Sequence, residues 1–306
     1  MALGASPPFR VHLSALYIYP VKSLRGIAVD SAEIDELGLV GDRRFLLIDA
    51  HGQFLTQRTL PRMAQIATAL SPDSLTLSAD GHGSISVSRH TPPHHTPARI
   101  PVSIWRSKNL LADDCGPDPA AWLSSFLQTP VRLVRIGSHF RRPVLYKSAF
   151  APPSLPANTP RVENRLVGDD LLTFADGYPF LAVSEASLAH LNDRLISRGA
   201  EPVPMNRFRP NLVLSGCEPF AEDTWPRLRV GEVSFLPAGP CGRCIVTTTD
   251  QLTGERDGPE PLRTLATFRR DPADPTDVNF GQNFVHETKS GSLRVGATAH
   301  VIRPPE

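Results

Sequence analysis

The chain has 306 residues, and its 32 Lys and Arg nearly balance its 31 Asp and Glu, which gives a formal net charge of +1 at pH 7. Such a balance excludes the strong electrostatic field of a protein that binds nucleic acid or an anionic membrane. No apolar run approaches the roughly 18 residues that span a bilayer, and the length suits one large domain or two ordinary ones.

The opening residues, Met1 to Pro8, lack the basic and apolar regions of a secretory signal. The four cysteines have no regular spacing, which indicates a reducing compartment rather than a disulfide framework. We therefore expect a cytoplasmic protein without a membrane span.

The N-terminal half has the pattern of many short β-strands. Strand-forming residues occupy 11–21, 29–34, 45–49, 53–56, 75–77, 84–88 and 131–136. Asp118 and Pro119 suit the N-cap and the first position of a helix that extends to Gln128. Residues 137–160 are rich in proline and irregular, so we expect a domain junction or a lid loop there.

The C-terminal half mixes strands with a few helices. It begins with a buried strand at 180–183, followed by a helix from a Ser184 cap to Gly199. Further strands are expected at 212–215, around 285 and at 293–301, with a helix at 261–270. The pattern as a whole predicts a β-rich, mixed α/β fold.

Two cysteines, Cys241 and Cys244, enclose Gly242 and Arg243. The β-branched run at 245–249 is strand-forming, so we expect both cysteines on the loop that enters a strand. The guanidinium of Arg243 favours the thiolate, which is the form that binds metal. From these residues alone the pair is compatible with half of a zinc site, a redox dithiol or two inert buried cysteines.

Five separated motifs follow one another along the chain. They are YPVKS at 19–23, GDRRF at 41–45, RFRPNLV at 207–213, CGRC at 241–244 and FGQNFV at 280–285. Together they resemble the MOSC family, and within it the mitochondrial amidoxime-reducing components and their bacterial relatives. The resemblance implies an N-terminal MOSC-associated β-barrel-type domain at 10–136, packed on a MOSC β-barrel domain with a few helices at 137–306.

The resemblance also implies a site for the molybdenum cofactor, Mo-molybdopterin. In the family the metal ligand is the cysteine that follows an arginine, which makes Cys244 the metal ligand and the catalytic residue here. The cofactor contacts that the resemblance implies are Lys22, Ser23, Arg44, Gly177, Tyr178, Arg209, Asn211, Gly242 and Arg243. Gly177 and Tyr178 stand where relatives have a Thr-Ser pair, and Gly242 where they often have serine, so backbone contacts are expected there.

By the same resemblance the chain is expected to reduce small N-hydroxylated substrates: amidoximes, hydroxylamines and N-hydroxylated base analogues. The sequence shows neither iron–sulfur spacing nor a Gly-rich dinucleotide loop. Electrons are therefore expected from a separate ferredoxin, cytochrome b5-type protein or flavin reductase. The alternative is a molybdenum cofactor carrier or sulfur-transfer module without turnover, because MOSC domains also occur in molybdenum cofactor sulfurases.

Overall fold

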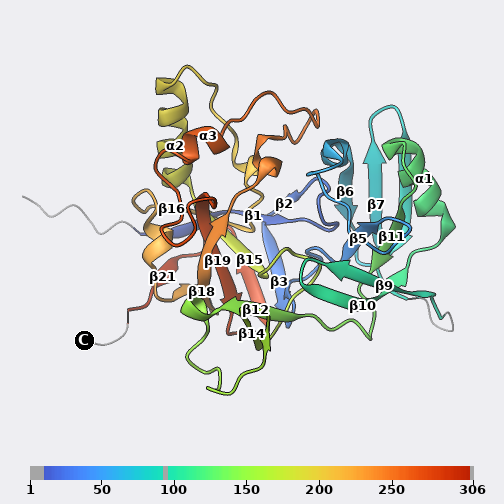
Figure 1. Ribbon diagram of the computed structural model, residues 1–306, viewed down its shortest axis with the longest axis horizontal. Coiled ribbons are helices and arrows are strands. Elements are labelled where there is room, and N and C mark those ends of the chain that lie inside the picture. The colour runs from blue at the N-terminus through green and yellow to red at the C-terminus, as the bar shows by residue number, and fades with distance from the viewer. Residues whose placement is uncertain (1–9, 92–95, 304–306) are drawn as a thin grey trace, which may run out of the picture.

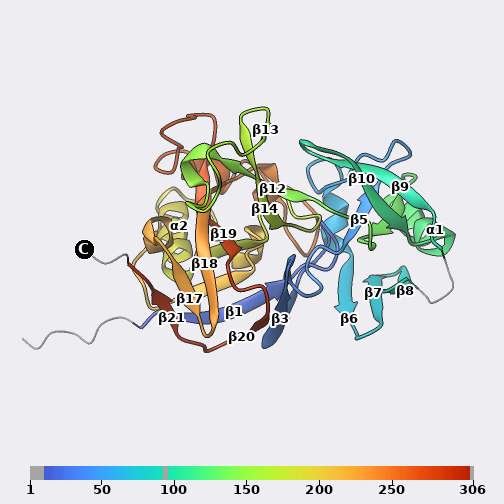
Figure 2. The same ribbon diagram turned by 90° about the horizontal axis from the view of Figure 1, so that it is seen from below.

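The computed structural model describes residues 10–91 and 96–303. The segment Met1–Pro8, expected to lack a secretory signal, lies outside these ranges. No helix among the described residues is long and apolar enough to cross a membrane. The chain forms two lobes side by side, and strands β5 to β11 make up most of the second lobe (Figures 1 and 2).

The first lobe is organised around an eight-stranded sheet. In spatial order its strands are β2 (Ile27–Val29), β1 (His12–Ile18), β16 (Leu212–Ser215), β15 (Phe180–Ser184), β19 (Asn279–His286), β18 (Val233–Gly242), β17 (Leu228–Val230) and β21 (Ala299–Val301). Only the pair β15 and β16 is parallel. Strand β15 lies between β16 and β19, and all five of its residues are buried, which explains why its sequence is apolar almost without interruption.

The first strands of the chain complete this lobe. Strand β1 pairs with β16, and β3 (Ser31–Asp35) pairs with both β4 (Gly38–Leu39) and β20 (Gly291–Arg294). Residues 12–39 are therefore tied by backbone hydrogen bonds to the C-terminal half of the chain. The division of the chain at residues 136 and 137 stays a prediction.

Helices α2 (Glu185–Ser197) and α3 (Leu262–Leu265) pack on one face of the sheet, where Leu191 and Leu265 join a cluster with Val183 and Phe280. The Ser184 hydroxyl caps α2 as predicted, since it accepts a hydrogen bond from the Ser187 amide at 3.0 Å. Helix α3 is shorter than the predicted 261–270. Its continuation turns back toward the sheet, where Arg270 forms a bridge with Val278.

The proline-rich segment expected to be a junction or lid contains a strand. It is β12 (Pro143–Lys147), which pairs with β14 (Arg165–Leu171), and β14 pairs with β13 (Arg161–Val162). The alternation along β12 turns Val144 and Tyr146 into a cluster with Ala238 and Val285 of the large sheet. Burial of these apolar side chains holds the strand against the first lobe.

The second lobe packs α1 (Pro117–Leu127) together with two smaller sheets. One contains β5 (Phe45–Ile48), β11 (Arg132–Arg135), β10 (Ser107–Asp114) and β9 (Arg99–Ile104), and the other β6 (Ala67–Leu70), β7 (Ser74–Ala79) and β8 (Gly83–Ser88). Leu123 and Phe126 of α1 join the core of this lobe. The helix is capped by Gly116 at a φ of 94°, and Asp118, the expected cap, lies in its first turn.

Short 3-10 turns complete the chain. They are η1 (Pro61–Gln65), η2 (Ser148–Phe150), η3 (Met205–Arg207), η4 (Ala221–Thr224) and η5 (Ile245–Thr248). With only three α-helices among the described residues, the structure confirms the predicted β-rich, mixed α/β fold.

Strand β19 has a glycine, Gly281, whose replacement tests the packing of the central sheet. Its φ is +79°, and an added Cβ would lie 2.7 Å from the Ala182 carbonyl oxygen. Gly231 has a similar φ of +58° but no atom within 4 Å of such a Cβ. We expect Gly281→Ala to lower the free energy of unfolding by about 1–3 kcal/mol more than Gly231→Ala does. Urea unfolding measures both variants, and equal losses would contradict this packing.

Candidate functional site

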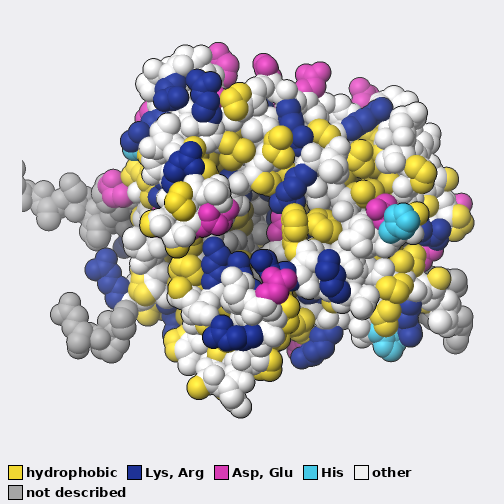
Figure 3. Space-filling view, in the orientation of Figure 1, with side chains coloured by type: hydrophobic (Ala, Val, Ile, Leu, Met, Phe, Trp, Pro, Cys, Tyr) yellow, Lys and Arg dark blue, Asp and Glu magenta, His cyan; other side chains and the backbone are white. Residues whose placement is uncertain are grey.

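A cavity of about 140 Å³ opens at one edge of the large sheet, where the C-terminal ends of β1 and β18 meet the N-terminal ends of β15 and β16. Its walls come from parts of the chain that are far apart in sequence: 22–23, 175–181, 207–211 and 241–247, with Arg43, Arg58 and Asn283. Figure 3 shows a hollow near the centre of this face of the molecule, with Lys and Arg side chains gathered at its lower edge.

Positive charge dominates the lining. Six cationic side chains and one carboxylate, that of Asp176, line the cavity, and two of the cations pair with Asp42 and Asp250 behind the wall, which leaves a formal excess of three positive charges (6 − 3). The six are Lys22, Arg43, Arg58, Arg207, Arg209 and Arg243. Because like charges at such density repel one another, this lining favours an anionic ligand.

Strained backbone places three of the lining residues. Ser23, Arg43 and Arg209 have φ values of 66°, 48° and 55°, in the left-handed region that residues with a Cβ rarely adopt. Such strain costs about 1–3 kcal/mol per residue and is held in place by the surrounding structure. Three strained residues around one cavity indicate that their orientation is functional.

Lys22 and Asp176 form an ion pair at the cavity wall. Lys22 is only 5% exposed, and burial lowers its pKa to about 8, although the neighbouring Asp176 raises it. Desolvation raises the pKa of Asp176, but Lys22 and then Arg58 outweigh it and hold that pKa well below its usual range. Asp176 therefore stays ionised at neutral pH, and Lys22 beside it is mostly protonated there.

Two arginines of the cavity lack a carboxylate partner within the described residues. Arg209 donates to the Gln251 side-chain oxygen at 3.1 Å, and burial lowers its pKa to about 10. Arg243 donates to the carbonyls of Phe280 and Phe208 at 2.7 and 3.0 Å. Its Nη2 atom is buried and has no hydrogen-bond partner in the described chain. A buried donor without a partner is costly, so the Arg243 guanidinium carries an unsatisfied donor beside the cavity.

Arg44, expected at the site, lies outside the cavity, and Arg43 lines it instead. The Arg44 guanidinium binds both oxygens of Asp35, at 2.7 and 2.9 Å. The tight turn before β5 aims consecutive side chains in different directions, and motif matching could not decide which of the two faces the site. All the other expected residues, including Asn211, line the cavity.

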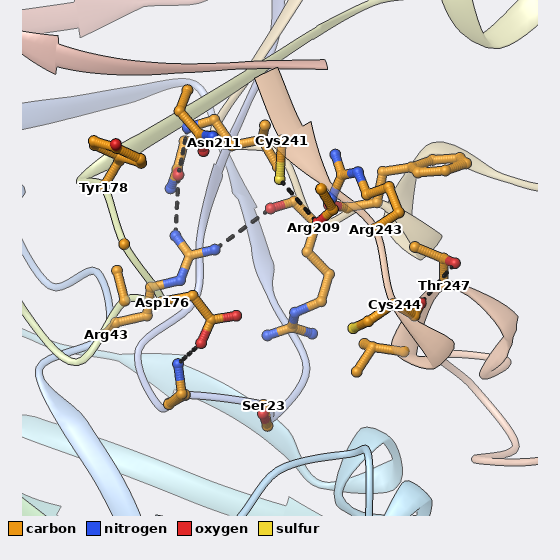
Figure 4. A pocket seen from close by; sticks show the side chains of 18 of the residues that line it. Ser23, Arg43, Asp176, Tyr178, Arg209, Asn211, Cys241, Arg243, Cys244 and Thr247 are labelled. Atoms are coloured by element: carbon orange, nitrogen blue, oxygen red, sulfur yellow. Dashed lines mark hydrogen bonds and ion pairs between the residues drawn. The ribbon is translucent and has the colours of Figure 1, made fainter. Parts of the chain in front are cut away.

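The cysteine loop differs from the prediction. Cys241 is the penultimate residue of strand β18, and Cys244 caps the turn η5, whereas 245–249 was expected to be a strand. The Thr247 amide and hydroxyl both donate to the Cys244 carbonyl at 3.0 Å, and these bonds stabilise the turn against the strand preference of the sequence. Figure 4 shows Cys244 beside Thr247 and Cys241 at a separate position.

The two thiols also differ in environment. Burial raises the pKa of Cys241, and the opposing effect of Arg243 is smaller, so Cys241 stays a neutral thiol. Arg243 lowers the pKa of Cys241 as expected, but burial outweighs that effect.

Sequence reasoning missed several lining residues, among them Arg58, Asp176 and Arg207. The available signal for Asp176 was a charged residue four positions before the apolar strand β15. Arg207 donates to the Thr248 carbonyl and the Asp250 carboxylate, at 2.8 and 3.1 Å, and so attaches the cysteine loop to the 207–211 segment. No sequence pattern marks that contact.

Comparison of the sequence with protein-family models identifies two matching domains. Residues 10–130 match the MOSC N-terminal beta barrel domain, and residues 169–300 match the MOSC domain. The chain is 36% identical to mitochondrial amidoxime-reducing component 1 of Homo sapiens, over 95% of this chain and 82% of that protein. This chain belongs to the MOSC family. It is also 35% identical to the Mus musculus protein of the same name, over 95% of this chain and 82% of that one. With mitochondrial amidoxime reducing component 2 of Bos taurus it shares 34% identity, over 93% of this chain and 81% of that one.

The cavity of this MOSC protein fits an anionic ligand with a soft metal. Arg209 and Arg243 offer charge without a carboxylate partner among the described residues, and Cys244 offers a sulfur at the wall. Guanidinium groups bind phosphate through paired hydrogen bonds, and thiolates bind soft metals. These two chemistries in one cavity are those required to hold a metal-bearing anionic cofactor.

The ionisation of Lys22 predicts a pH effect on stability. Between pH 8, near the lowered pKa, and about 10.5, its ordinary value, the unfolded chain binds more protons at Lys22 than the folded chain. The free energy of unfolding that Lys22 contributes therefore rises with pH across this window. Urea unfolding of the wild type and Lys22→Met from pH 7 to 11 isolates the contribution by difference. Parallel curves would mean that Lys22 has an ordinary pKa.

Proposed function

We propose that this MOSC protein is a molybdenum-cofactor-dependent reductase of N-hydroxylated compounds. The observation that supports the proposal is the cavity itself, with six cationic side chains around one carboxylate and the Cys244 thiol in its wall. Relatives that match more than 90% of the chain are named for amidoxime reduction.

In this proposal each side of the cavity has a separate role. Arg209 and Arg243, with Lys22 and Arg43, bind the anionic groups of the cofactor, and Cys244 is the metal ligand. Ser23, Asn211 and the backbone around Gly177, Tyr178 and Gly242 complete the walls. When bound, the cofactor supplies the two-electron chemistry that reduces an N–OH group.

The reduction breaks one N–O bond. It consumes two electrons and two protons, releases water and leaves an N–H group on the product. Lys22, whose pKa burial lowers to about 8, holds a proton at Nζ beside the ionised Asp176. The electrons come from a separate redox protein, of the ferredoxin, cytochrome b5 or flavin reductase type.

We also propose a reducing, cytoplasmic location, since all four cysteines are free.

The test compares protein from cells that make the molybdenum cofactor with protein from cells that do not. We expect molybdenum and a released pterin in the first preparation only, and conversion of benzamidoxime to benzamidine with a reduced dye by the same preparation. Stoichiometric zinc with no pterin would overturn the proposal. Bound cofactor with no reduction of any N–OH compound would instead identify a carrier or sulfur-transfer module.

The two cysteines provide a second prediction. Cys244 is fixed by η5 at the cavity wall, whereas Cys241 is a neutral thiol at the end of β18. Cys244→Ser should therefore abolish reduction, even where part of the pterin stays bound to the arginines, and Cys241→Ser should keep substantial activity. Molybdenum, pterin and dye-driven turnover are measured for both variants. An inactive Cys241→Ser beside an active Cys244→Ser would reverse the ligand assignment, and loss of activity in both with molybdenum retained would favour a dithiol role.

A further inference from the structure

A second and larger cavity, of about 440 Å³, adjoins the first. The two share the wall formed by Asp176, Gly177, Tyr178, Cys241, Gly242 and Asn283. We call this second cavity the outer chamber. Its remaining walls come from the tip of the β9–β10 hairpin and from β12 and β14, below the centre of Figure 1. Its volume falls within the range of about 300–1,000 Å³ typical of small-molecule sites.

Two cations face each other across strands in the wall of the outer chamber. Lys147 of β12 and Arg165 of β14 are direct partners in the antiparallel register, and both are half-buried. Like charges directly opposite each other destabilise a sheet. Neither forms an ion pair within residues 10–91 and 96–303. Side-chain hydrogen bonds and, to a smaller extent, the charge of Lys147 lower the pKa of Asp271 and Asp274, so these carboxylates offset part of that charge. The remaining repulsion between Lys147 and Arg165 is a cost that a bound anion would remove.

The other charges of the outer chamber have partners, except for the Asp277 carboxylate, which forms no ion pair among the described residues. Arg106 pairs with Glu163 at 2.5 Å, and Asp176 pairs with Lys22. The guanidinium of Arg142, a buried residue, donates to the Ser107 hydroxyl and to backbone carbonyls of the 173–176 segment. Asp277 lies beside Gly242, at the wall that the two cavities share. Lys147 and Arg165 are therefore the cations available to a ligand.

An aromatic side chain stands at the edge of the same chamber. Trp105 is 42% exposed, at the tip of the β9–β10 hairpin, with a φ of +52°. Its indole N–H donates to Asp176 at 3.0 Å, its ring contacts Phe54 edge-on at 4.8 Å, and the Arg58 guanidinium lies 4.6 Å from the ring centre. A large aromatic residue held exposed, with a strained backbone, is a rigid contact surface for a flat ligand.

We propose that the outer chamber is the substrate-binding chamber of this protein, and that it selects planar N-hydroxylated compounds with a carboxylate or phosphate group. Trp105 contacts the flat part of the substrate, and Lys147 and Arg165 bind its anion. The N–OH group lies toward the shared wall at Cys241 and Gly242, and so toward the first cavity. The catalytic part of this inference rests on the proposed reductase function, whereas the binding preference does not.

The test compares benzamidoxime with 4-carboxybenzamidoxime. Calorimetry on cofactor-loaded protein without reductant measures binding alone, and dye-driven reduction measures kcat/KM. We expect both affinity and kcat/KM to be about tenfold or more higher for the carboxylated compound, because a hydrogen bond between charged groups is worth at least that factor. The double variant Lys147→Gln/Arg165→Gln should lose most of this preference.

Arg161→Gln is the matched control, because Arg161 is an exposed cation of the adjacent strand β13 that does not line the chamber. It should keep the preference. Equal binding of the two compounds by the wild type, or an undiminished preference in the double variant, would overturn the inference while benzamidoxime reduction still supported the reductase. Preferential binding with no reduction of either compound would overturn the reductase and leave the binding site. The double variant could instead keep the normal preference for the carboxylated compound and lose turnover only when a protein electron donor replaces the dye. That outcome would show that Lys147 and Arg165 dock an acidic redox partner and not the substrate.

Discussion

One buried carboxylate, that of Asp42, joins the segments that form the cavity. It is 2% exposed and accepts hydrogen bonds from the Tyr19 amide, the Arg43 guanidinium and the Asn211 side chain, at 2.8, 2.7 and 3.2 Å. These donors come from the end of β1, the turn before β5 and the segment before β16. A buried carboxylate needs such donors to remain charged, so Asp42 constrains all three segments at once.

The aromatic ring of Tyr19 adds a second constraint at the same place. The guanidinium groups of Arg43 and Arg209 lie 4.6 and 4.3 Å from the centre of this buried ring. Among the described residues Arg43 pairs with one carboxylate, Asp42, and Arg209 with none, so the ring stabilises part of the charge that remains. The arginines are thereby oriented before any ligand arrives, which reduces the cost of ordering them on binding.

The arrangement separates the task of holding a cofactor from that of admitting a substrate. Uncompensated charge lies deep in the first cavity, whereas the outer chamber combines an exposed aromatic surface with a cross-strand pair of cations. The 175–178 segment and the end of β18 divide the two cavities. The Arg142 guanidinium donates hydrogen bonds to the Ala175 and Asp176 carbonyls of the 175–178 segment. This buried residue lies outside the first cavity and holds the boundary between the two cavities in place.

The sequence by itself determined the β-rich class, the position of the Ser184 cap and the family, because these depend on local pattern and on motifs that stay contiguous. It also brought Lys22, Arg209, Asn211 and Cys244 to one site through those motifs. Tertiary structure alone decided that Arg43 rather than Arg44 faces the cavity, because the direction of a side chain in a tight turn depends on partners such as Asp42 and Asp35. It also decided that residues 245–248 form a turn and that Asp176 completes the wall. Those outcomes depend on hydrogen bonds and ion pairs, such as the Asp176–Lys22 pair, that form only after distant segments meet, and no local propensity encodes them.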